Sequence, residues 1–426
     1  MRFNTISMIG LGYIGLPTAA VFASRKINVI GVDINQHAVD TINRGDIHIV
    51  EPDLDMVVHA AVNEGYLRAT TSPEPADAFL IAVPTPFKGD NHEPDLSYIA
   101  SAAKAIAPVL SKGNLVILES TSPVGTTEQM AEWLAEVRPD LTFPQTHGEA
   151  SDIRIAHCPE RVLPGHVLRE LVQNDRIIGG MTTQCSQAAC DLYKTFVVGE
   201  CVVTTARTAE MCKLTENSFR DVNIAFANEL SMICDKLEID VWELIRLANR
   251  HPRVNILQPG PGVGGHCIAV DPWFIVSKTP DVARLISVAR EVNDAKPSWV
   301  VNKVKAGVQR LLQKKNSQDK AEVSVVFFGM SFKADIDDLR ESPSLSIVSE
   351  CQRIEGVKCY VVEPHITNLP EELDMSELLL FSGDMRVDVV VLLVDHKEFL
   401  CEEFFHVVKN SGECIDCRGV LSRLVK

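Results

Sequence analysis

A pattern at the start of the chain restricts the fold more than any other feature. An apolar run at residues 5–9 is followed by the six residues GLGYIG, and a helical pattern and a second apolar run then lead to Asp33. A strand, a glycine-rich turn, a helix, a second strand and an acidic residue in this order are typical of the dinucleotide-binding βαβ unit. Its two strands are parallel, so the pattern predicts a doubly wound α/β sheet.

The glycine-rich turn also predicts the cofactor. Gly10 permits the tight turn, Gly12 lets the backbone approach a pyrophosphate, and Gly15 lets the helix pack closely on the strand. The pyrophosphate is expected at the helix N-terminus, where backbone N–H groups favour anions. Asp33 can accept both ribose hydroxyls and repels a 2′-phosphate, so NAD is expected rather than NADP. The alternative is a turn without a ligand. The predicted contacts are Gly10, Gly12, Tyr13, Ile14, Gly15 and Asp33.

Polar residues follow three further apolar runs, at residues 78–83, 115–119 and 153–158. Thr85 and Thr121 follow the first two runs. Ligands of doubly wound sheets lie at the carboxyl ends of the strands, so both threonines are expected to meet the cofactor or the substrate. Capping of the next helix is the alternative for their hydroxyls. Glu160 follows the third run and could be either a base or a salt-bridge partner.

A long helix is predicted in the middle of the chain. Residues 208–237 contain neither proline nor glycine, and their apolar residues recur at helical spacing. Lys213 and Asn217 lie one turn apart and therefore share a face of this helix. Glu210, one turn before Lys213, is expected to be solvated. The alternative for Lys213 is an ordinary surface lysine.

A glycine-rich loop follows that helix and ends in a cysteine. Four glycines fall within residues 260–265, so neither a helix nor a strand fits before Cys267. A cysteine at the end of such a loop, with Asp271 four residues on, is a candidate nucleophile. The alternative is a small buried hydrophobic residue, which is what a cysteine most often is. Two separate helices are predicted after the loop, at residues 281–293 and 296–312.

A second α/β series begins at residue 323, after a polar segment. Lys333 and Arg340 lie in the loop after its first strand, where they suit a phosphate-bearing ligand. The alternative is a charged loop that pairs with its own aspartates. Two Rossmann-like α/β domains joined by a helical middle part are therefore expected. The predicted boundaries are 1–200 for the NAD-binding domain, 201–313 for the central helical domain and 314–426 for the C-terminal domain.

Composition limits the partners and the compartment. The net charge of −16 argues against nucleic acid as a partner, because phosphate binding requires a basic surface. No apolar run approaches the length of a membrane span, and the N-terminus has no signal-peptide pattern. Twelve scattered cysteines then suggest reduced thiols in the cytoplasm. Cys414 and Cys417 form one C-x-x-C without a second pair at zinc spacing, so no metal site is expected.

Together these residues suggest the oxidation of an aldehyde. Oxidation of an alcohol alone needs a base and a hydride acceptor but no nucleophile. The Cys267 thiolate, by contrast, can add to an aldehyde and form a thiohemiacetal that yields a thioester. Lys213 and Asn217 would stabilise the developing oxyanion. Glu160 is the candidate base for the water that hydrolyses the thioester, and Asp271 would orient that water or Lys213.

The chain resembles the UDP-glucose/GDP-mannose dehydrogenase family over nearly all of its length. The motifs that carry the resemblance are GLGYIG, Glu119-Ser120-Thr121, Pro159-Glu160, Lys213 with Asn217, Gly264-Gly265-His266-Cys267 with Asp271, and Phe332-Lys333 through Pro343. The resemblance implies the four-electron oxidation of a UDP-sugar by two NAD⁺ in turn, with Cys267 as nucleophile and Thr121 holding a catalytic water.

The resemblance also implies partners and further contacts. A homodimer built on the long helix is expected, with an arginine of one copy reaching the nucleotide of the other, and Arg253 is the nearest matching position. The C-terminal domain is expected to bind the UDP-sugar. The implied substrate contacts are Glu160, Arg161, Lys213, Asn217, Arg253, Gly264, Phe332 and Lys333, and the implied cofactor contacts include Thr85, Thr121 and Arg340.

Two departures from the glucose-type pattern bear on the sugar. Arg161 and Pro164 stand where glucose-type members carry an aromatic residue and a second glutamate. The pattern resembles the branch that oxidises N-acetylated sugars, and Arg161 is a candidate contact for the N-acetyl carbonyl. This branch implies a product for bacterial surface polysaccharide of the enterobacterial common antigen type. Three alternatives remain: a UDP-glucose dehydrogenase, a two-electron hydroxyacid-type dehydrogenase with a structural Cys267, and a non-catalytic NAD-binding regulator.

Overall fold

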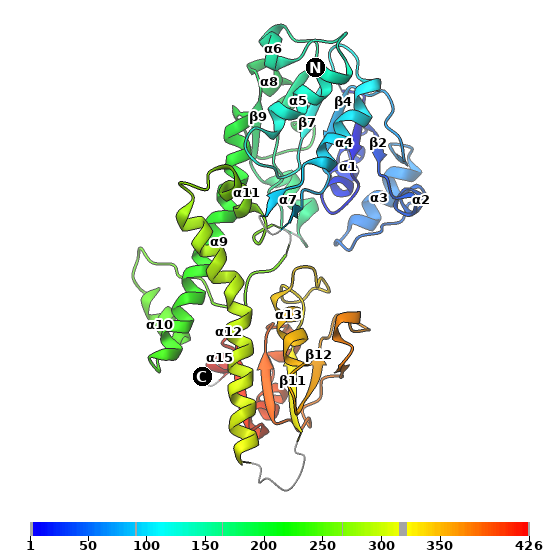
Figure 1. Ribbon diagram of the computed structural model, residues 1–426. Coiled ribbons are helices and arrows are strands. Elements are labelled where there is room, and N and C mark those ends of the chain that lie inside the picture. The colour runs from blue at the N-terminus through cyan, green and yellow to red at the C-terminus, as the bar shows by residue number, and fades with distance from the viewer. Residues whose placement is uncertain (1–2, 90–91, 164, 266, 315–321, 425–426) are drawn as a thin grey trace. The chain divides into compact units, whose positions relative to one another are not determined.

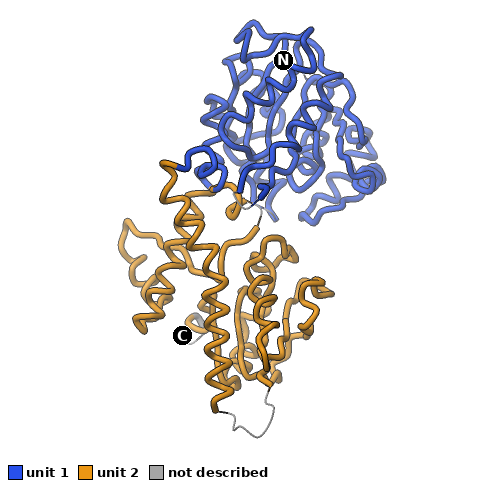
Figure 2. The backbone as a smooth tube through the Cα atoms, in the orientation of Figure 1, with its two compact units in different colours: residues 1–216, 273–280 blue, residues 217–272, 281–426 orange. Residues whose placement is uncertain are grey.

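The computed structural model describes residues 3–89, 92–163, 165–265, 267–314 and 322–424 of the 426-residue chain (Figure 1). The chain divides into two compact units (Figure 2). The first consists of Met1–Glu216 with Trp273–Pro280, and the second of Asn217–Pro272 with Asp281–Lys426. The three predicted domain boundaries remain a prediction.

An eight-stranded sheet forms the centre of the first unit, in the order β10-β9-β8-β7-β4-β1-β2-β3. Its strands are β1 Thr5–Ile9, β2 Asn28–Val32, β3 Leu67–Thr70, β4 Ala78–Ile81, β7 Leu115–Leu118, β8 Arg154–His157, β9 Arg176–Gly180 and β10 Cys201–Thr205. Neighbours are parallel except β8 and β9, which are antiparallel. A two-stranded hairpin is formed by β5 Phe87–Lys88 and β6 Glu93–Pro94.

Helices cover both faces of this sheet. One apolar cluster contains buried residues of α1, α3, α7 and α8, and a second cluster contains those of α4 and α5. The helices are α1 Gly15–Ser24, α2 Gln36–Asn43, α3 Leu54–Asn63, α4 Ser97–Ile106, α5 Thr126–Val137, α6 Pro144–His147, α7 Val167–Gln173 and α8 Thr183–Tyr193, with short 3₁₀ turns η1 Ala107–Val109 and η2 Gly148–Ala150. The predicted doubly wound fold is confirmed.

The second unit contains a five-stranded, fully parallel sheet in the order β13-β12-β11-β14-β15. Its strands are β11 Val323–Phe328, β12 Val357–Val362, β13 Ser376–Leu378, β14 Val389–Leu392 and β15 Glu413–Asp416. Helices α12 Arg284–Lys314 and α13 Pro343–Cys351 pack in one apolar cluster, and η4 Lys397–Phe399, α14 Glu402–Asn410 and α15 Val420–Leu424 in the other. The remaining 3₁₀ turn is η3 Glu371–Leu373. The second predicted α/β series is therefore also confirmed.

Three more helices lie between the two sheets in the sequence. They are α9 Ala206–Lys236, α10 Val241–Ala248 and α11 Asp271–Lys278. The long helix predicted at residues 208–237 is confirmed as α9. Because the boundary between the units falls after Glu216, α9 begins in one unit and continues in the other.

The prediction of two separate helices after the glycine-rich loop is wrong. A single helix, α12, runs through Pro297, which stands inside it. Proline removes one helical hydrogen bond and crowds the preceding turn, so other contacts must hold the helix together there. Buried polar contacts between α9 and α12 precede this position. Arg290 pairs with Asp221 at 2.6 Å, and Asn228 donates to Asn293 at 2.9 Å.

Among the described residues, no helix has the combination of length and apolar character needed to cross a membrane.

Candidate active site

The glycine-rich turn after β1 has the geometry that the fingerprint predicts. Gly10 has a positive φ of 91°, and a Cβ there would lie 2.4 Å from the carbonyl oxygen of Ala82. A Cβ on Gly15 would lie 1.8 Å from the carbonyl oxygen of Gly10. Around Gly12, by contrast, a Cβ would meet nothing within 4 Å. Gly10 and Gly15 are therefore required by the fold, whereas Gly12 borders open space that suits a ligand.

The acidic residue after β2 lies beside this turn. Asp33 accepts a hydrogen bond at Oδ2 from the backbone N–H of Leu11, at 2.9 Å, and one at Oδ1 from that of Asn35. Each carboxylate oxygen can accept a second bond, so both can still receive a ribose hydroxyl. Of the other two predicted contacts, Tyr13 is exposed and Ile14 is half-buried at the start of α1. This donor and acceptor set fits a dinucleotide.

Thr85 and Thr121 meet at the carboxyl ends of β4 and β7. The Thr85 hydroxyl donates to the backbone carbonyl of Thr121 at 2.6 Å. Ser120 is bonded to both the N–H and the carbonyl of Val83, at 2.9 and 2.8 Å. These bonds join the loops that follow two adjacent strands. The Thr121 side chain is half-buried.

Glu160 is part of a buried charge cluster that sequence reasoning missed. Its Oε2 accepts two bonds from the Arg176 guanidinium, at 2.8 and 2.6 Å, and its Oε1 accepts the N–H of Arg161. Arg176 also lies 3.6 Å from Glu119, whose Oε1 accepts the Tyr193 hydroxyl. Burial raises the pKa of Glu119, the Arg176 guanidinium opposes the rise and the charge of Glu160 adds to it, so that the pKa reaches about 7. The salt-bridge alternative for Glu160 therefore describes its state here.

Two carboxylates of α9, Glu216 and Glu210, have partners that the sequence did not indicate. The guanidinium of Arg161 pairs with Glu216, with its NH2 group 2.6 Å from Oε1. Glu210 was expected to be solvated, and that expectation is wrong. It is buried, and its carboxylate accepts the N–H groups of Gly125 and Thr127 and the Thr127 hydroxyl at 2.6–2.8 Å. Glu210 thus caps the N-terminus of α5.

Two predicted catalytic residues of the second unit, Asn217 and Asp271, are in direct contact. Asn217 on α9 donates to the Asp271 carboxylate at 2.5 Å, and both side chains are buried. The backbone N–H of Asp271, the first residue of α11, donates to the carbonyl of Cys267 at 2.9 Å. Lys213 is half-buried one turn before Asn217 on the same helix. The Asn217 amide and the Asp271 carboxylate thus form a bonded pair, and the backbone of Asp271 is bonded to that of Cys267.

Cys267 differs from every other cysteine in its exposure. All twelve cysteines lie within the described residues, and Cys267 is the one that is exposed. Burial raises the pKa of others, such as Cys359 and Cys414, to about 12. A nucleophilic thiolate needs access to solvent and substrate. The alternative of a small buried hydrophobic residue therefore does not describe Cys267.

The glycines before Cys267 pack against the loop that contains Phe332 and against Pro343, the first residue of α13. A Cβ on Gly264 would lie 2.4 Å from the carbonyl oxygen of Glu341, and a Cβ on Gly262 would lie 2.7 Å from Pro343. Gly265 has a φ of 82° and faces the Phe332 ring. The predicted Gly264 and Phe332 contacts are thus neighbours. The crowding at these glycines comes from the protein itself, so they hold the cysteine loop against the C-terminal sheet.

Charged residues lie at the same edge of that sheet. Lys333 is exposed, whereas Arg340 pairs with Asp338, two residues away, at 2.6 Å. The alternative of a loop that pairs with its own aspartates therefore describes Arg340. Arg418, which sequence reasoning missed, pairs with Asp395 at 2.7 Å, and its guanidinium would be 2.9 Å from a Cβ on Gly260.

The remaining positions considered in the sequence are Arg253, His266, Cys414 and Cys417. Arg253 is exposed in the loop after α10, and His266 lies outside the described residues. Cys414 lies within β15 and Cys417 directly follows it, as expected for residues at a strand end.

Comparison with protein families matches three domain models. They are the NAD binding domain of the UDP-glucose/GDP-mannose dehydrogenase family at residues 4–197, its central domain at 207–295 and its UDP binding domain at 326–423.

Similar proteins cover nearly the whole chain. The NDP-N-acetyl-D-galactosaminuronic acid dehydrogenase of Ralstonia nicotianae is 68% identical over 99% of this chain and 97% of its own. The UDP-N-acetyl-D-mannosamine dehydrogenase of Yersinia pestis is 67% identical over 94% of this chain and 95% of its own. Among solved structures, the UDP-N-acetyl-mannosamine dehydrogenase of Staphylococcus aureus has a TM-score of 0.82 at 41% identity, over 98% and 95% of the two chains.

Proposed function

Because the chain belongs to the UDP-glucose/GDP-mannose dehydrogenase family, whose members are NAD-dependent nucleotide-sugar dehydrogenases, we propose that it oxidises UDP-N-acetyl-D-mannosamine. The product is UDP-N-acetyl-D-mannosaminuronate, formed by a four-electron oxidation at C6 that uses two NAD⁺. Several relatives at 66–67% identity carry the name of this dehydrogenase, including those of Yersinia pestis and Campylobacter jejuni. The product serves a bacterial surface polysaccharide, such as enterobacterial common antigen.

The exposed Cys267 carries this proposal, because a second oxidation is the step that requires a nucleophile. Bound NAD⁺ supplies the hydride acceptor in both oxidations. The sulfur of Cys267 adds to the aldehyde carbon and forms a C–S bond. Loss of a hydride from the thiohemiacetal gives a thioester, and water then cleaves the C–S bond, which releases the carboxylate and restores the thiol.

Five further residues are proposed to orient and stabilise these steps. Lys213 and Asn217, one turn apart on α9, stabilise the negative oxygen of the alkoxide and of the thiohemiacetal. Asp271 accepts a bond from the Asn217 amide, so it fixes the direction in which that amide points. Thr121 holds the hydrolytic water, and Glu160 accepts its proton. Arg176 donates two hydrogen bonds to Oε2 of Glu160, so the guanidinium fixes the orientation of the carboxylate that accepts this proton.

Counting NADH tests the mechanism. The wild-type protein should form two NADH per UDP-N-acetyl-D-mannosamine consumed, and mass spectrometry should find the uronate. Cys267→Ala should form no carboxylate, whereas Cys201→Ala, which removes a half-buried thiol from β10, should keep the two-to-one ratio. One NADH per substrate in the wild type would instead support the two-electron hydroxyacid-type reaction. No turnover with any nucleotide sugar would support the non-catalytic regulator.

A second candidate substrate follows from the relatives of Ralstonia. They are named NDP-N-acetyl-D-galactosaminuronic acid dehydrogenases, and they match at 68% identity over 99% of this chain. A panel of UDP-N-acetyl-D-mannosamine, UDP-N-acetyl-D-galactosamine, UDP-N-acetyl-D-glucosamine and UDP-glucose separates the candidates by kcat/KM. The proposal expects the mannosamine derivative to react best and UDP-glucose to react poorly.

Arg161 is the proposed determinant of the N-acetyl group. Its ion pair with Glu216 fixes the guanidinium near the start of α9, which also carries Lys213. Arg161→Phe should lower kcat/KM for the N-acetylated sugar more than for UDP-glucose. An unchanged preference would remove Arg161 from this role.

A homodimer is proposed as the working form. The second unit exposes a row of large apolar residues along α9 and directly after it, namely Phe219, Phe226, Ile233 and Leu237. Exposed apolar surface of this kind marks an interaction site. Arg253, exposed after α10, is the proposed residue by which one copy reaches the nucleotide bound to the other.

The proposed place of action is the cytoplasm, where NAD⁺ and nucleotide sugars are available and cysteine thiols stay reduced. Nucleic acid is not a proposed partner, because the net charge of −16 disfavours phosphate backbones.

A further inference from the structure

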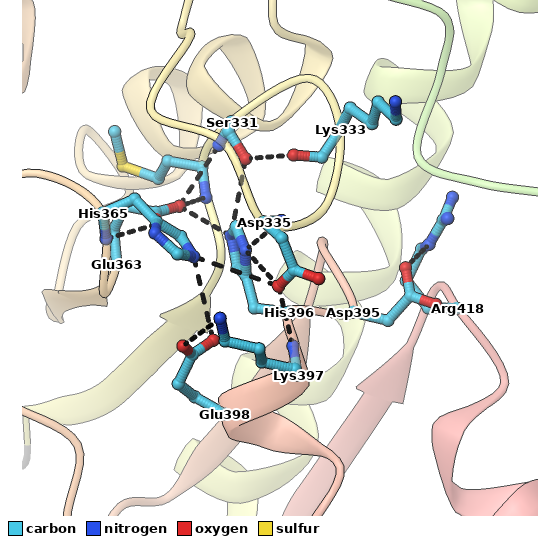
Figure 3. Close-up of polar contacts among 11 residues, drawn as sticks. Ser331, Lys333, Asp335, Glu363, His365, Asp395, His396, Lys397, Glu398 and Arg418 are labelled. Atoms are coloured by element: carbon cyan, nitrogen blue, oxygen red, sulfur yellow. Dashed lines mark hydrogen bonds and ion pairs between the residues drawn. The ribbon is translucent and has the colours of Figure 1, made fainter. Parts of the chain in front are cut away.

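A cluster of histidines and carboxylates lies at one edge of the C-terminal sheet. Asp335 follows β11, His365 follows β12, and His396 and Glu398 follow β14. These three strands are neighbours and parallel, so the loops after them meet at the same edge. The candidate ligand atoms of the four residues all lie within 4.8 Å of one another, and Figure 3 shows their side chains turned toward a common centre.

Three of the four residues offer atoms with the separations of a metal site. Nε2 of His365 lies 3.7 Å from Oε2 of Glu398 and 4.0 Å from Oδ1 of Asp335. Ligand atoms that each lie about 2.0–2.2 Å from one metal can be up to roughly 4 Å apart. These separations exceed the length of a hydrogen bond, so the atoms face one another without a hydrogen bond between them.

Two of these atoms are buried without a hydrogen-bond partner. Nε2 of His365 and Oε2 of Glu398 are shielded from solvent, and within the described part of the chain neither makes a hydrogen bond. Buried polar atoms in folded proteins nearly always have a partner. A cation between them would satisfy both atoms and balance the two carboxylates.

His396 supports the cluster from behind. It is fully buried, its Nδ1 accepts the backbone N–H of Asp335 at 2.9 Å, and its Nε2 lies 3.0 Å from Oε2 of Glu363. Because Nδ1 accepts, Nε2 carries the proton and donates to Glu363. Both ring nitrogens are therefore engaged. Glu363 also accepts the backbone N–H of His365 at 3.1 Å, so one carboxylate contacts both histidine positions. Partners of this kind are typical of the residues that orient metal ligands.

We propose that Asp335, His365 and Glu398 bind one divalent first-row transition metal cation, with His396 and Glu363 as positioning residues. One imidazole and two carboxylates form a mixed nitrogen and oxygen donor set, which suits cations such as Mn²⁺, Co²⁺ or Zn²⁺ better than the all-oxygen cations Ca²⁺ and Mg²⁺. The ligands are about thirty residues apart in the sequence, so they do not form a short sequence motif.

The site also bears on the proposed substrate. Asp335 stands two residues after Lys333, and the Ser331 hydroxyl donates to the carbonyl of Lys333 at 2.6 Å within the same loop. A cation on Asp335 would hold this loop in one conformation. Resting on the proposed function, the expected effect of the cation is a lower KM for the UDP-sugar with little change in kcat.

Metal binding is tested without substrate. Chelator-treated protein is titrated with Mn²⁺, and free Mn²⁺ is followed by electron paramagnetic resonance. The wild type should bind one ion. His365→Ala and Glu398→Gln should each weaken binding by at least tenfold, whereas His406→Ala and Glu402→Gln, exposed controls on α14, should bind as the wild type does. Equal binding by all five proteins, or no binding by the wild type, would overturn the proposal.

Two further readouts distinguish this site from metal binding elsewhere on the protein. Co²⁺ bound to nitrogen and oxygen gives visible d–d bands without an intense thiolate charge-transfer band, so a charge-transfer band would assign the metal to cysteines and overturn the proposal. The metal should also raise the melting temperature of the wild type and the controls, but not of His365→Ala. These measurements hold even if the nucleotide sugar is not the substrate, so their failure and that of the proposed function are distinguishable.

Discussion

Glu119 illustrates at the scale of one residue how burial controls charge. It is fully buried, and its Oε2 has no hydrogen-bond partner among the described residues. Burial raises its pKa from 4.5 to about 7, so the folded state keeps a proton that the unfolded state has lost in this range. Stability should therefore fall as the pH rises from about 4.5 to about 7.

Glu119→Gln removes this proton uptake and keeps the shape of the side chain. In the wild type, the contribution of Glu119 to the free energy of unfolding should decrease by about 3 kcal/mol as the pH rises from about 4.5 to about 7. The variant should lack that decrease. Urea denaturation at a series of pH values measures both proteins. Glu132→Gln, at an exposed position on α5, should keep the wild-type slope. The same slope in Glu119→Gln would show that the carboxyl group titrates normally.

Gly12 and Gly10 should respond to alanine in opposite ways. A Cβ on Gly12 meets no atom within 4 Å, so Gly12→Ala should leave the melting temperature unchanged but raise the KM for NAD⁺ at least about tenfold. Gly10 has a φ of 91° and faces the Ala82 carbonyl, so Gly10→Ala should lower the melting temperature. An unchanged KM in Gly12→Ala would mean that the dinucleotide does not approach this backbone.

The residue-scale predictions succeeded where the signal is local. Gly10, Gly15 and Asp33 belong to a pattern that is complete within thirty residues, and their geometry follows from it. The partners of Glu160 and Glu210 lie 16 and more than 80 positions away. A single sequence gives no signal for such pairs, because any buried carboxylate can be satisfied by many donors.

At the scale of an element, the N-terminus of α5 depends on one side chain from another helix. Glu210 of α9 accepts two backbone N–H groups and one hydroxyl of that terminus. Glu210→Ala would leave these buried donors without a partner, which should cost about 2–3 kcal/mol of unfolding free energy. Urea denaturation measures the loss, with Glu136→Ala at an exposed position of α5 as the control. Equal losses in both variants would exclude the capping role.

Helix α12 explains why element boundaries were partly missed. Proline usually ends or kinks a helix, so Pro297 favoured two shorter helices. Arg290, Asn293 and Lys296 of α12 are nevertheless buried against polar groups of α9, and these contacts reach the residue directly before Pro297. Packing against a neighbouring helix thus overrides local propensity. The strands, in contrast, were predicted from apolar runs whose burial is nearly complete, such as β11.

At the scale of the whole molecule, the proposed dimer depends on the apolar row of α9. Phe226 is 57% exposed, and Phe226→Asp would place a charge in the middle of that row. The wild type should sediment as a dimer, whereas Phe226→Asp should shift to monomers. Val198→Asp, at an exposed apolar position of the first unit, should remain dimeric. Dimers of Phe226→Asp at low micromolar concentration would exclude this surface as the interface.

The division of the chain into two units has a consequence for genetic recombination between relatives. The backbone passes from one unit to the other after Glu216, after Pro272 and after Pro280. Trp273, in the short returning segment, stacks on His92 with ring centroids 4.3 Å apart. A single genetic crossover between the positions of His92 and Trp273 would therefore combine a returning segment from one parent with a contacting hairpin from the other. Recombination that exchanges a whole unit needs three breakpoints, so we expect members of this lineage to diverge by point substitution rather than by shuffling their halves.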